Sequence, residues 1–417
     1  MPSPRLEAVK TVQRILRDGA YSSIALSNSQ TNAGLSAPDR ALYAAIVRTV
    51  VERKLALDEI ISVFVQKKPD TVCVCALYVG LAQILFMQKV PDPAACDETV
   101  SAVKALTDSR RAGFVNAVLR SVCRQKDRAY KAIEDAPLNV RYSLSKEICD
   151  MLVSQYPEQA ESALGAVFSR PPLCLRVNTL RTNASDLAQK LAEKGVECTY
   201  DGDCVTVNAG ADKLIEDIGD EYFVQGRNSQ YAVKLLGARQ GMTVIDVCAC
   251  PGGKTLGAAL DMRNEGKIYA FDIHANKLSL IERSAASLGI DIISVSERDS
   301  RTCDLSLENT ADRVICDVPC SSLGVLASKP EIRYKDISSL DTLYKTQSEI
   351  LASSAKYLKP GGRMVYSTCT FNKNENENAV RAFLAGNGTY KLVSERVFLA
   401  EDGYFDGFYA ALIERTE

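Results

Sequence analysis

Two cysteines stand directly after short apolar runs of the sequence. Cys320 lies in DVPCS (Asp317–Ser321), and Cys369 lies in STCT (Ser367–Thr370). Each run has the composition of a buried strand, so each cysteine is predicted to lie in an exposed turn rather than in a core. A thiolate in such a turn can act as a nucleophile, and two such turns in one chain favour covalent catalysis.

A glycine pair lies in the loop DVCACPGGKT (Asp246–Thr255), which follows the apolar run Met242–Ile245. Gly252 and Gly253 have no Cβ, so the backbone of this loop can approach a ligand closely. The loop does not fit the phosphate-binding pattern G-x-x-x-x-G-K-[ST], because the first glycine would fall at Cys248. It does not fit the dinucleotide pattern G-x-G-x-x-G either, because it has a single glycine pair.

An acidic residue follows the next predicted strand. Asp272 comes after the strand-like run Lys267–Phe271, at roughly the 20-residue offset from Gly253 at which a carboxylate meets a ribose hydroxyl. A glycine loop and a ribose acid without a phosphate site suit a nucleoside cofactor such as S-adenosylmethionine. A tight turn with a structural aspartate is the alternative that these residues leave open.

Methylation of a pyrimidine at C5 would explain why such a cofactor needs thiols. The C5 carbon of cytosine is too weak a nucleophile to take a methyl group from a sulfonium, and a thiolate that adds to C6 makes C5 enamine-like. A hydrogen bond or a proton given to N3 would ease the addition, and Asp317 is the candidate acid. Lys254 is a candidate for lowering a thiol pKa or orienting the base. A surface lysine is its alternative, which the dipole of the predicted helix disfavours.

From residue 226 onward, strand-like and helix-like runs alternate, which predicts a mostly parallel, Rossmann-like α/β sheet with helices on both faces. Later predicted strands are Ile292–Val295, Arg313–Cys316 and Arg363–Tyr366, and the longest predicted helices are Ala275–Leu288 and Leu343–Leu358. Ligands of open α/β sheets bind at the carboxyl ends of the strands. Four candidate residues fall at these ends: Asp272, Asp299, Asp317 and Cys369.

The residues before this sheet divide into two predicted domains. Residues 1–134 show helical spacing of apolar residues, with Ser36 and Asp39 as candidate caps of one helix. Residues 135–225 contain two strand-like runs and a helix that is predicted to begin with Ser185 as its cap. We therefore expect an all-α domain (1–134), a small α/β subdomain (135–225) and a catalytic domain (226–417).

The composition is that of an ordinary globular protein, with 417 residues, 46% hydrophobic residues and a formal net charge of −2. The sequence MPSPRLEAVK has no apolar signal core, and no run approaches the ~18 apolar residues of a membrane span, so we expect a cytoplasmic protein. There are 14 cysteines without a C-x-x-C pair, and His274 is the only histidine. These features predict reduced thiols and no metal site. The stretch Arg110–Lys131 is locally basic, which a solvated helix explains about as well as RNA binding does.

Taken together, these motifs resemble the RNA (cytosine-5) methyltransferase family. The resemblance is to its bacterial ribosomal RNA subgroup, called RsmB or Sun, in which a NusB-like RNA-binding domain precedes the methyltransferase. It covers nearly the whole chain. Besides the loop and the cysteine motifs, it rests on GFVNAVLRSV (Gly113–Val122), EYFVQGRNSQ (Glu221–Gln230), DVPCSSLGVL (Asp317–Leu326) and DGYFDGFYAALIER (Asp402–Arg415).

The resemblance implies roles that the residues alone do not rank. It implies that Cys369 is the nucleophile and that Cys320 assists product release. It also implies a set of residues that hold S-adenosylmethionine: Cys248, Ala249, Cys250, Pro251, Gly252, Gly253, Lys254, Asp272, Asp299 and Asp317. The chain departs from the family pattern at Cys250, where alanine is usual, and at Arg298–Ser300, where Gly-Asp-Gly is common.

These observations lead us to expect a monomeric enzyme that methylates C5 of a cytidine in small-subunit (16S) ribosomal RNA through a covalent cysteine–C6 adduct. The target base must be unstacked to reach the thiol, so a loop or an unpaired region is favoured. A cytosine-5 methyltransferase of tRNA or another RNA is one alternative. An ATPase using Gly253–Thr255 and a non-enzymatic RNA-binding factor are alternatives of other classes.

Overall fold

The computed structural model describes residues 3–18, 34–67, 69–207, 219–400 and 406–417. The chain forms two compact units. The first comprises Met1–Ser154 with Lys329–Asp336, and the second comprises Gln155–Ser328 with Ile337–Glu417. A short 3-10 helix, η3 (Pro330–Tyr334), therefore belongs to the first unit although it follows the Cys320 motif in sequence.

The first unit is helical, as its apolar spacing predicted. Its centre is α5 (Thr71–Phe86), which is buried over nearly its whole length and packs against α1, α3, α4, α6 and α7. Asp70 caps α5 by accepting a hydrogen bond from the Cys73 N–H at 3.0 Å. The other helices are α1 (Pro4–Asp18), α3 (Ala37–Glu52), α4 (Lys54–Phe64), α6 (Asp92–Leu106), α7 (Ser109–Arg124), α8 (Lys126–Glu134), α9 (Leu138–Arg141) and α10 (Lys146–Gln155).

Of the three predicted helix caps, Ser36 is confirmed, whereas Asp39, which lies inside the first turn of α3, and Ser185 are wrong. Ser36 caps α3, since its side chain accepts a hydrogen bond from the Asp39 N–H. Ser185 does not cap α12 (Ala184–Glu193), because Asn183 precedes it and accepts a hydrogen bond from the Asp186 N–H at 3.0 Å. Asn and Ser are nearly equal as caps, so only the backbone conformation at Asn183 decides between them.

A small antiparallel sheet begins the second unit, after α11 (Ala160–Ala166). Its strands are β1 (Leu173–Val177), β2 (Cys198–Asp201), β3 (Cys204–Val207) and β4 (Tyr222–Val224), in the order β2-β3-β1-β4. Leu187 and Leu191 of α12 pack against the apolar side of this sheet.

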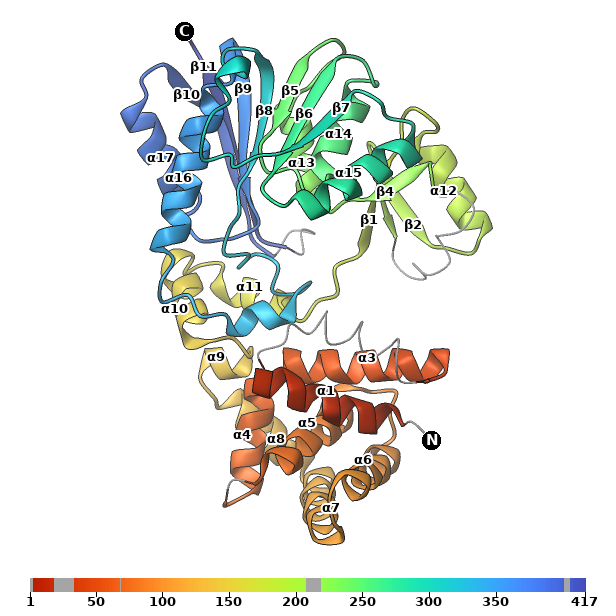
Figure 1. The fold of residues 1–417 in the computed structure, drawn as a ribbon. Helices are drawn as coiled ribbons and strands as arrows, with labels where there is room; N and C mark the ends of the chain where they lie inside the picture. Colours follow the sequence, from red (N-terminus) through yellow and green to blue (C-terminus); the bar gives the residue numbers. More distant parts are fainter. Residues whose placement is uncertain (1–2, 19–33, 68, 208–218, 401–405) are drawn as a thin grey trace. The chain divides into compact units, whose positions relative to one another are not determined.

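The larger sheet of the second unit has seven strands in the order β10-β11-β9-β8-β5-β6-β7 (Figure 1). The strands from β9 to β7 are parallel, and β11 is antiparallel to both β9 and β10. This confirms the predicted, mostly parallel α/β fold. The strands are β5 (Thr243–Asp246), β6 (Lys267–Asp272), β7 (Ile293–Glu297), β8 (Ala311–Asp317), β9 (Leu358–Thr368), β10 (Tyr390–Phe398) and β11 (Phe408–Arg415).

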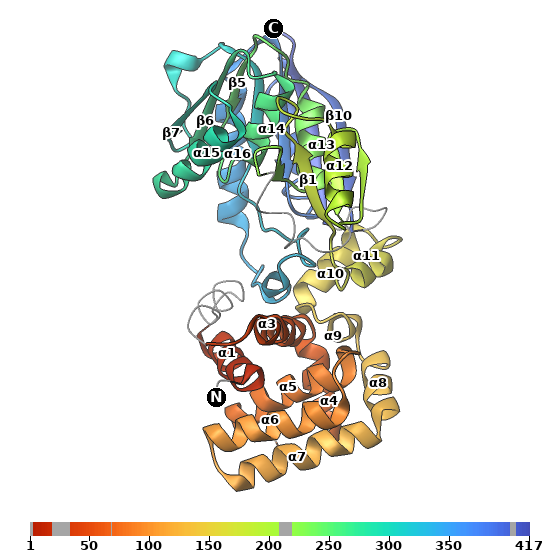
Figure 2. The same ribbon diagram turned by 90° about the vertical axis from the view of Figure 1, so that its right-hand side faces the viewer.

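Helices cover both faces of this sheet (Figures 1 and 2). One face packs against α13 (Arg227–Leu236), α14 (Gly253–Asp261) and α15 (Ala275–Leu288), and the other against α16 (Asp341–Ala355) and α17 (Glu377–Gly386). Neighbouring strand residues alternate between the two cores, as Val314 and Ile315 do. The prediction that α16 extends to Leu358 is wrong: the helix ends at Ala355 and Leu358 opens β9, because Pro360 and Gly361 follow and cannot continue a helix.

Candidate active site

The carboxyl ends of neighbouring parallel strands carry the predicted site residues. β5 ends at Asp246, β6 ends at Asp272, β8 ends at Asp317, and β9 ends one residue before Cys369. Since the four strands lie side by side in the order β9-β8-β5-β6, these residues meet at one edge of the sheet. This is the convergence that the alternation of strands and helices predicted.

The sulfur atoms of the two cysteine motifs lie 3.1 Å apart. The pKa of Cys369 is lowered because Cys320 gives it a hydrogen bond, which outweighs the opposing effect of burial. The pKa of Cys320 is raised well above its usual value, because its proton is held in that bond and because the group is buried. The Ser322 hydroxyl lies 3.6 Å from the Cys369 sulfur. The pair is therefore asymmetric, because the pKa of Cys369 is lowered and that of Cys320 is raised.

The turn after Cys320 is held against the other cysteine motif by its backbone. The Gly324 N–H donates to the Cys369 carbonyl at 2.9 Å, and the Gly407 N–H donates to the Gly324 carbonyl at 2.7 Å. A Cβ at Gly324 would lie 1.9 Å from the Gly407 carbonyl oxygen. Only glycine allows this approach, so the glycine at position 324 lets the turn after Cys320 lie against the Cys369 motif.

An ion pair lies beside the sulfurs. Lys254 donates to Asp317 at 2.6 Å, and the Ser367 hydroxyl donates to the other oxygen of the same carboxylate at 2.6 Å. The Lys254 side chain is only 12% exposed, so it is not the surface lysine that the sequence left as an alternative. Burial by itself lowers the pKa of Lys254, but the negative charges of Asp317 and Asp246 outweigh it and the pKa is raised. Lys254 therefore stays protonated beside the sulfurs.

The glycine loop begins at a buried carboxyl. Asp246 is 1% exposed and accepts a hydrogen bond from the Thr255 hydroxyl at 2.7 Å. Burial raises the pKa of Asp246 to about 7. At Gly252 the backbone has φ 109°, which L side chains rarely adopt, and a Cβ there would lie 3.0 Å from Ile281. The loop thus needs glycine at this position, as its cradle-like sequence predicted.

Asp272 and Asp299 differ in their bonding partners. Both oxygens of Asp272 accept backbone hydrogen bonds, from the Cys250 N–H at 3.0 Å and the His274 N–H at 2.9 Å. Asp272 thereby ties the glycine loop to the end of β6. Asp299 instead binds Arg301, whose guanidinium lies 2.6 Å from one carboxylate oxygen. That contact lowers the pKa of Asp299.

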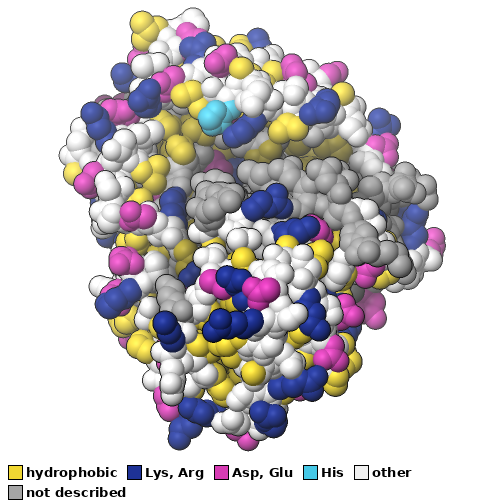
Figure 3. All heavy atoms as spheres, turned by 60° about the horizontal axis from the view of Figure 1, so that its bottom comes forward, with side chains coloured by type: hydrophobic (Ala, Val, Ile, Leu, Met, Phe, Trp, Pro, Cys, Tyr) yellow, Lys and Arg dark blue, Asp and Glu magenta, His cyan; other side chains and the backbone are white. Residues whose placement is uncertain are grey.

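Three residues of the basic stretch of the helical unit form ion pairs with acids. Arg111 pairs with Asp70 and Asp108, and two further pairs are Arg120–Asp97 and Lys126–Asp92. On the face shown in Figure 3, Lys and Arg side chains lie among Asp and Glu side chains. The local excess of positive charge in the sequence is thus reduced by acids from other helices.

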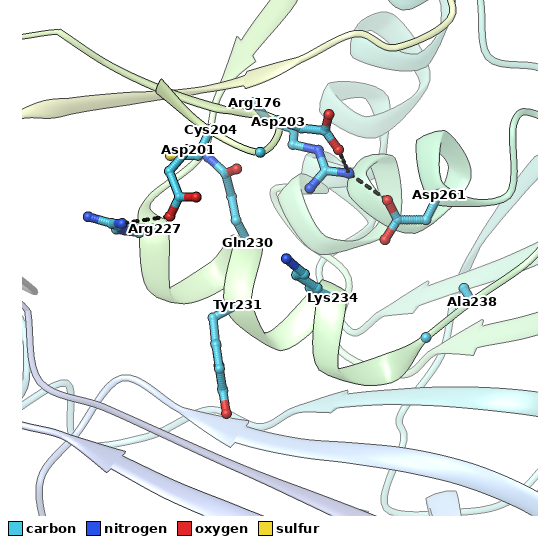
Figure 4. A pocket seen from close by; sticks show the side chains of 12 residues that line it. Arg176, Asp201, Asp203, Cys204, Arg227, Gln230, Tyr231, Lys234, Ala238 and Asp261 are labelled. Carbon is cyan, nitrogen blue, oxygen red and sulfur yellow. Dashed lines mark hydrogen bonds and ion pairs between the residues drawn. The ribbon is translucent and has the colours of Figure 1, made fainter. Parts of the chain in front are cut away.

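A cavity of about 480 Å³ lies in the second unit between the small sheet and α13. Arg176 is 5% exposed and lies between Asp261, at 2.5 Å, and Asp203, at 3.5 Å, as Figure 4 shows. A second pair in this cavity joins Arg227 to Asp201. The lining contains none of the predicted site residues, so this cavity between the small sheet and α13 is distinct from the cysteine site.

Comparisons with known proteins agree with this geometry. Three family profiles match the chain: "16S rRNA methyltransferase RsmB/F" over residues 233–404, the NusB family over 2–124 and the RsmF/B-like ferredoxin-like domain over 148–211. A Bacillus subtilis protein named probable ribosomal RNA small subunit methyltransferase B is 31% identical over 394 residues, which are 90% of this chain and 87% of that protein. The chain belongs to the RsmB family. The predicted family and its methyltransferase class are thus confirmed.

A further relative and one solved structure match nearly the whole chain, and a second structure matches two thirds of it. The Proteus mirabilis ribosomal RNA small subunit methyltransferase B is 28% identical over 98% of this chain and 97% of that protein. The crystal structure of PH0851 has a TM-score of 0.80 and 24% identity, and covers 100% of this chain and 99% of that one. A methyltransferase homologue from Pyrococcus horikoshii has a TM-score of 0.58 and 24% identity, over 67% of this chain and 97% of that one. These structures support the fold.

Two residues with contacts at the site were missed in the sequence. Gln225 donates to the Gly253 carbonyl at 2.8 Å and so supports the glycine loop from the motif EYFVQGRNSQ. Glu375 is fully buried behind the cysteines. It lies in FNKNENEN (Phe371–Asn378), directly after the Cys369 motif, and this polar run after a buried strand was the available signal. In this RsmB-family chain no helix of the described residues is long and apolar enough to cross a membrane, and no described cluster of His, Cys, Asp and Glu could hold a metal.

Proposed function

We propose that the protein transfers a methyl group from S-adenosylmethionine to C5 of a cytidine in 16S ribosomal RNA through a Cys369–C6 adduct. The observation that carries this proposal is the 3.1 Å separation of the Cys320 and Cys369 sulfurs. The Lys254–Asp317 pair lies beside them. Methylation of an amine or a hydroxyl needs no thiol nucleophile, whereas methylation at C5 of a pyrimidine does.

The side chains would act in sequence. The electron pair of the Cys369 thiolate forms the S–C6 bond. The proton that N3 takes up comes from the Lys254 ammonium, which donates to Asp317 at 2.6 Å, and the Asp317 carboxylate passes it on to N3. S-adenosylmethionine, when bound, supplies an electrophilic methyl group to C5. A base then takes the C5 proton, the C5–C6 double bond re-forms, and the Cys369 sulfur leaves with its electron pair. Cys320, in contact with that sulfur, assists the departure.

The acidic side chains at the strand ends fit this cofactor. Asp246, Asp272 and Asp317 surround a loop whose one lysine, Lys254, is already paired. Ribose hydroxyls and an ammonium group are donors that carboxylates accept, while a triphosphate would be repelled by the same acids. The loop from Cys248 to Lys254, with Asp272, Asp299 and Asp317, would hold the cofactor. NSun6 from Pyrococcus horikoshii, which has a TM-score of 0.58 and 18% identity, was crystallised with SFG.

Replacement of Asp272 by asparagine is expected to weaken binding of S-adenosylmethionine by roughly 10- to 100-fold, because a hydrogen bond to a charged group contributes about 1.5–3 kcal/mol. Isothermal titration calorimetry of the variant measures this. Asp291→Asn is the control. Asp291 is exposed and lies before the amino end of β7, whereas the predicted cofactor site is at the carboxyl ends of the strands. Equal affinity in wild type and Asp272→Asn would remove Asp272 from the cofactor site.

The RNA substrate is inferred from the relatives. The proteins from Bacillus subtilis and Proteus mirabilis are named ribosomal RNA small subunit methyltransferases, and the alignments span most of both chains. The match of residues 2–124 to the NusB family supports a role for the helical domain in positioning RNA. We expect the enzyme to act as a monomer in the cytoplasm, on an unstacked cytidine.

The test is incubation of the protein with S-adenosylmethionine and unmodified 16S ribosomal RNA, with tRNA in a parallel reaction. Mass spectrometry of nuclease fragments locates the new methyl group. The expected product is 5-methylcytidine at one site of the ribosomal RNA. A methyl group on an exocyclic amine or a ribose would contradict the mechanism, and 5-methylcytidine in tRNA alone would contradict the substrate.

A further inference from the structure

A fully buried carboxylate lies behind the two cysteine motifs. Glu375 is 0% exposed and lies two residues before the start of α17. Its oxygens accept hydrogen bonds from four groups: the Ser321 N–H at 2.8 Å, the Ser321 hydroxyl at 2.5 Å, the Gln347 side-chain amide at 2.9 Å and the Asn372 side-chain amide at 3.0 Å. Four donors facing two oxygens is the pattern that an ionised carboxylate requires.

These bonds connect the two reactive turns. Ser321 directly follows Cys320, and the Thr370 hydroxyl, which directly follows Cys369, lies 2.9 Å from the Ser321 hydroxyl. Glu375 therefore contacts the residue after Cys320 directly, and it reaches the residue after Cys369 through the Ser321 hydroxyl. Buried polar networks of this kind, when fully satisfied, fix one arrangement of the groups that they join.

Two further side chains, from α16 and β9, connect Glu375 to the strands that precede the cysteines. Gln347 of α16 donates both to Glu375 and to the Pro319 carbonyl at 2.9 Å. Tyr366 of β9 donates to the Glu375 carbonyl at 2.7 Å. Glu375 is thus tied to β9 through its backbone carbonyl, and to the turn after β8 through its carboxylate. These two strands lead into the cysteine motifs.

Charge is distributed unequally around the sulfur pair. The donors to Glu375 named above are all neutral, so none of them cancels its negative charge. That charge raises the pKa of Cys320, in addition to the larger effects of the Cys369 hydrogen bond and burial. At Cys369 the hydrogen bond from Cys320 has the largest effect and lowers the pKa, while the negative charge of Asp317 raises it and the positive charge of the paired Lys254 lowers it. The charge of Glu375 and the hydrogen bond between the sulfurs therefore both favour the proton on Cys320.

We propose that Glu375 is a positioning residue that assigns the two cysteines their different roles. It holds both turns at contact distance and places a buried negative charge on the Cys320 side, so Cys320 keeps its proton and Cys369 is the free thiolate. The inference rests on the proposed covalent chemistry. The electron pair that attacks C6 then comes from Cys369, and the proton that Cys320 keeps is available when that sulfur leaves.

The test is Glu375→Gln, which preserves size and removes the charge. In either orientation, the amide NH2 of glutamine faces two of the four donors, so the network is broken on one side. Brief alkylation by iodoacetamide between pH 6 and 9, with peptide mass spectrometry, gives the ratio of Cys369 to Cys320 modification. We expect this ratio to fall by roughly tenfold, which corresponds to one pKa unit of lost asymmetry. We expect kcat for ribosomal RNA to fall roughly 10- to 100-fold, with binding of S-adenosylmethionine unchanged.

Glu377→Gln is the matched control, because it makes the same change two residues away, inside α17, and should alter neither the ratio nor kcat. Fully buried Cys75 and Cys316 report unfolding, since they should stay unmodified in every variant. An unchanged alkylation ratio in a folded Glu375→Gln variant would overturn the inference. The ratio needs no RNA, so a failure of the proposed methylation would show separately, as a wild-type protein with the asymmetry but without 5-methylcytidine.

Discussion

The Cys369→Ser variant is expected to lose methyl transfer by at least about 10⁴-fold, the order of loss that follows removal of a catalytic nucleophile. A serine hydroxyl is a far weaker acid than the Cys369 thiol, whose pKa is lowered, so serine supplies no comparable nucleophile. Without addition at C6, C5 stays too weak a nucleophile to take the methyl group. The measurement is the initial rate of tritium transfer from labelled S-adenosylmethionine to unmodified 16S ribosomal RNA.

Binding of S-adenosylmethionine to Cys369→Ser should match wild type, which separates loss of chemistry from loss of folding. Cys303→Ser is the matched control, because Cys303 lies in the loop after β7 and its sulfur contacts the Asp304 carbonyl oxygen instead of the second active-site cysteine. It should retain full activity. Equal rates for wild type and Cys369→Ser would remove the nucleophile from the mechanism.

The Cys320→Ala variant is expected to accumulate a covalent protein–RNA adduct and to turn over little. Cys369 can still add to C6, but the sulfur that lies 3.1 Å away and assists its departure is missing. Loss of the Cys320 hydrogen bond should raise the pKa of Cys369, so the adduct should form faster at higher pH. The measurement is a slowly migrating, RNase-sensitive band in a denaturing gel.

The double variant Cys320→Ala/Cys369→Ser tests which sulfur carries the RNA. It should form no adduct, since its only change relative to Cys320→Ala is the loss of the nucleophile. An adduct in the double variant would show that another group bonds to the RNA. An adduct in Cys369→Ser alone would instead reverse the roles of the two cysteines.

Much of the site could be predicted because it depends on local order along the chain. Apolar runs followed by Asp272, Asp317 and Cys369 were recognisable as strands, and parallel strands carry their ends to one edge. The contact between the two sulfurs could not be predicted from this local order. It depends on β8 lying next to β9 in the sheet, and an apolar pattern does not state which strands are neighbours.

The errors and omissions of the sequence-based predictions arise from contacts between residues that are far apart in the chain. The acids that pair with Arg111, Arg120 and Lys126 include Asp70, Asp97 and Asp92, which lie on other helices or at their starts. A count of charges within one stretch therefore overestimated its free positive charge. In the same way, the partners of Glu375 come from the turn after β8 and from α16 as well as from its own loop, so the residue looked like part of a solvated polar turn.

The position of β11 has a consequence for the order in which the protein matures. β11 pairs along β9 with Tyr409 opposite Thr368, the residue before the nucleophile. While the chain is being synthesised, β9 has an unpaired edge until residues 408–415 emerge from the ribosome. The nascent polypeptide thus completes the pairing beside its reactive sulfurs only after residues 408–415 have been translated.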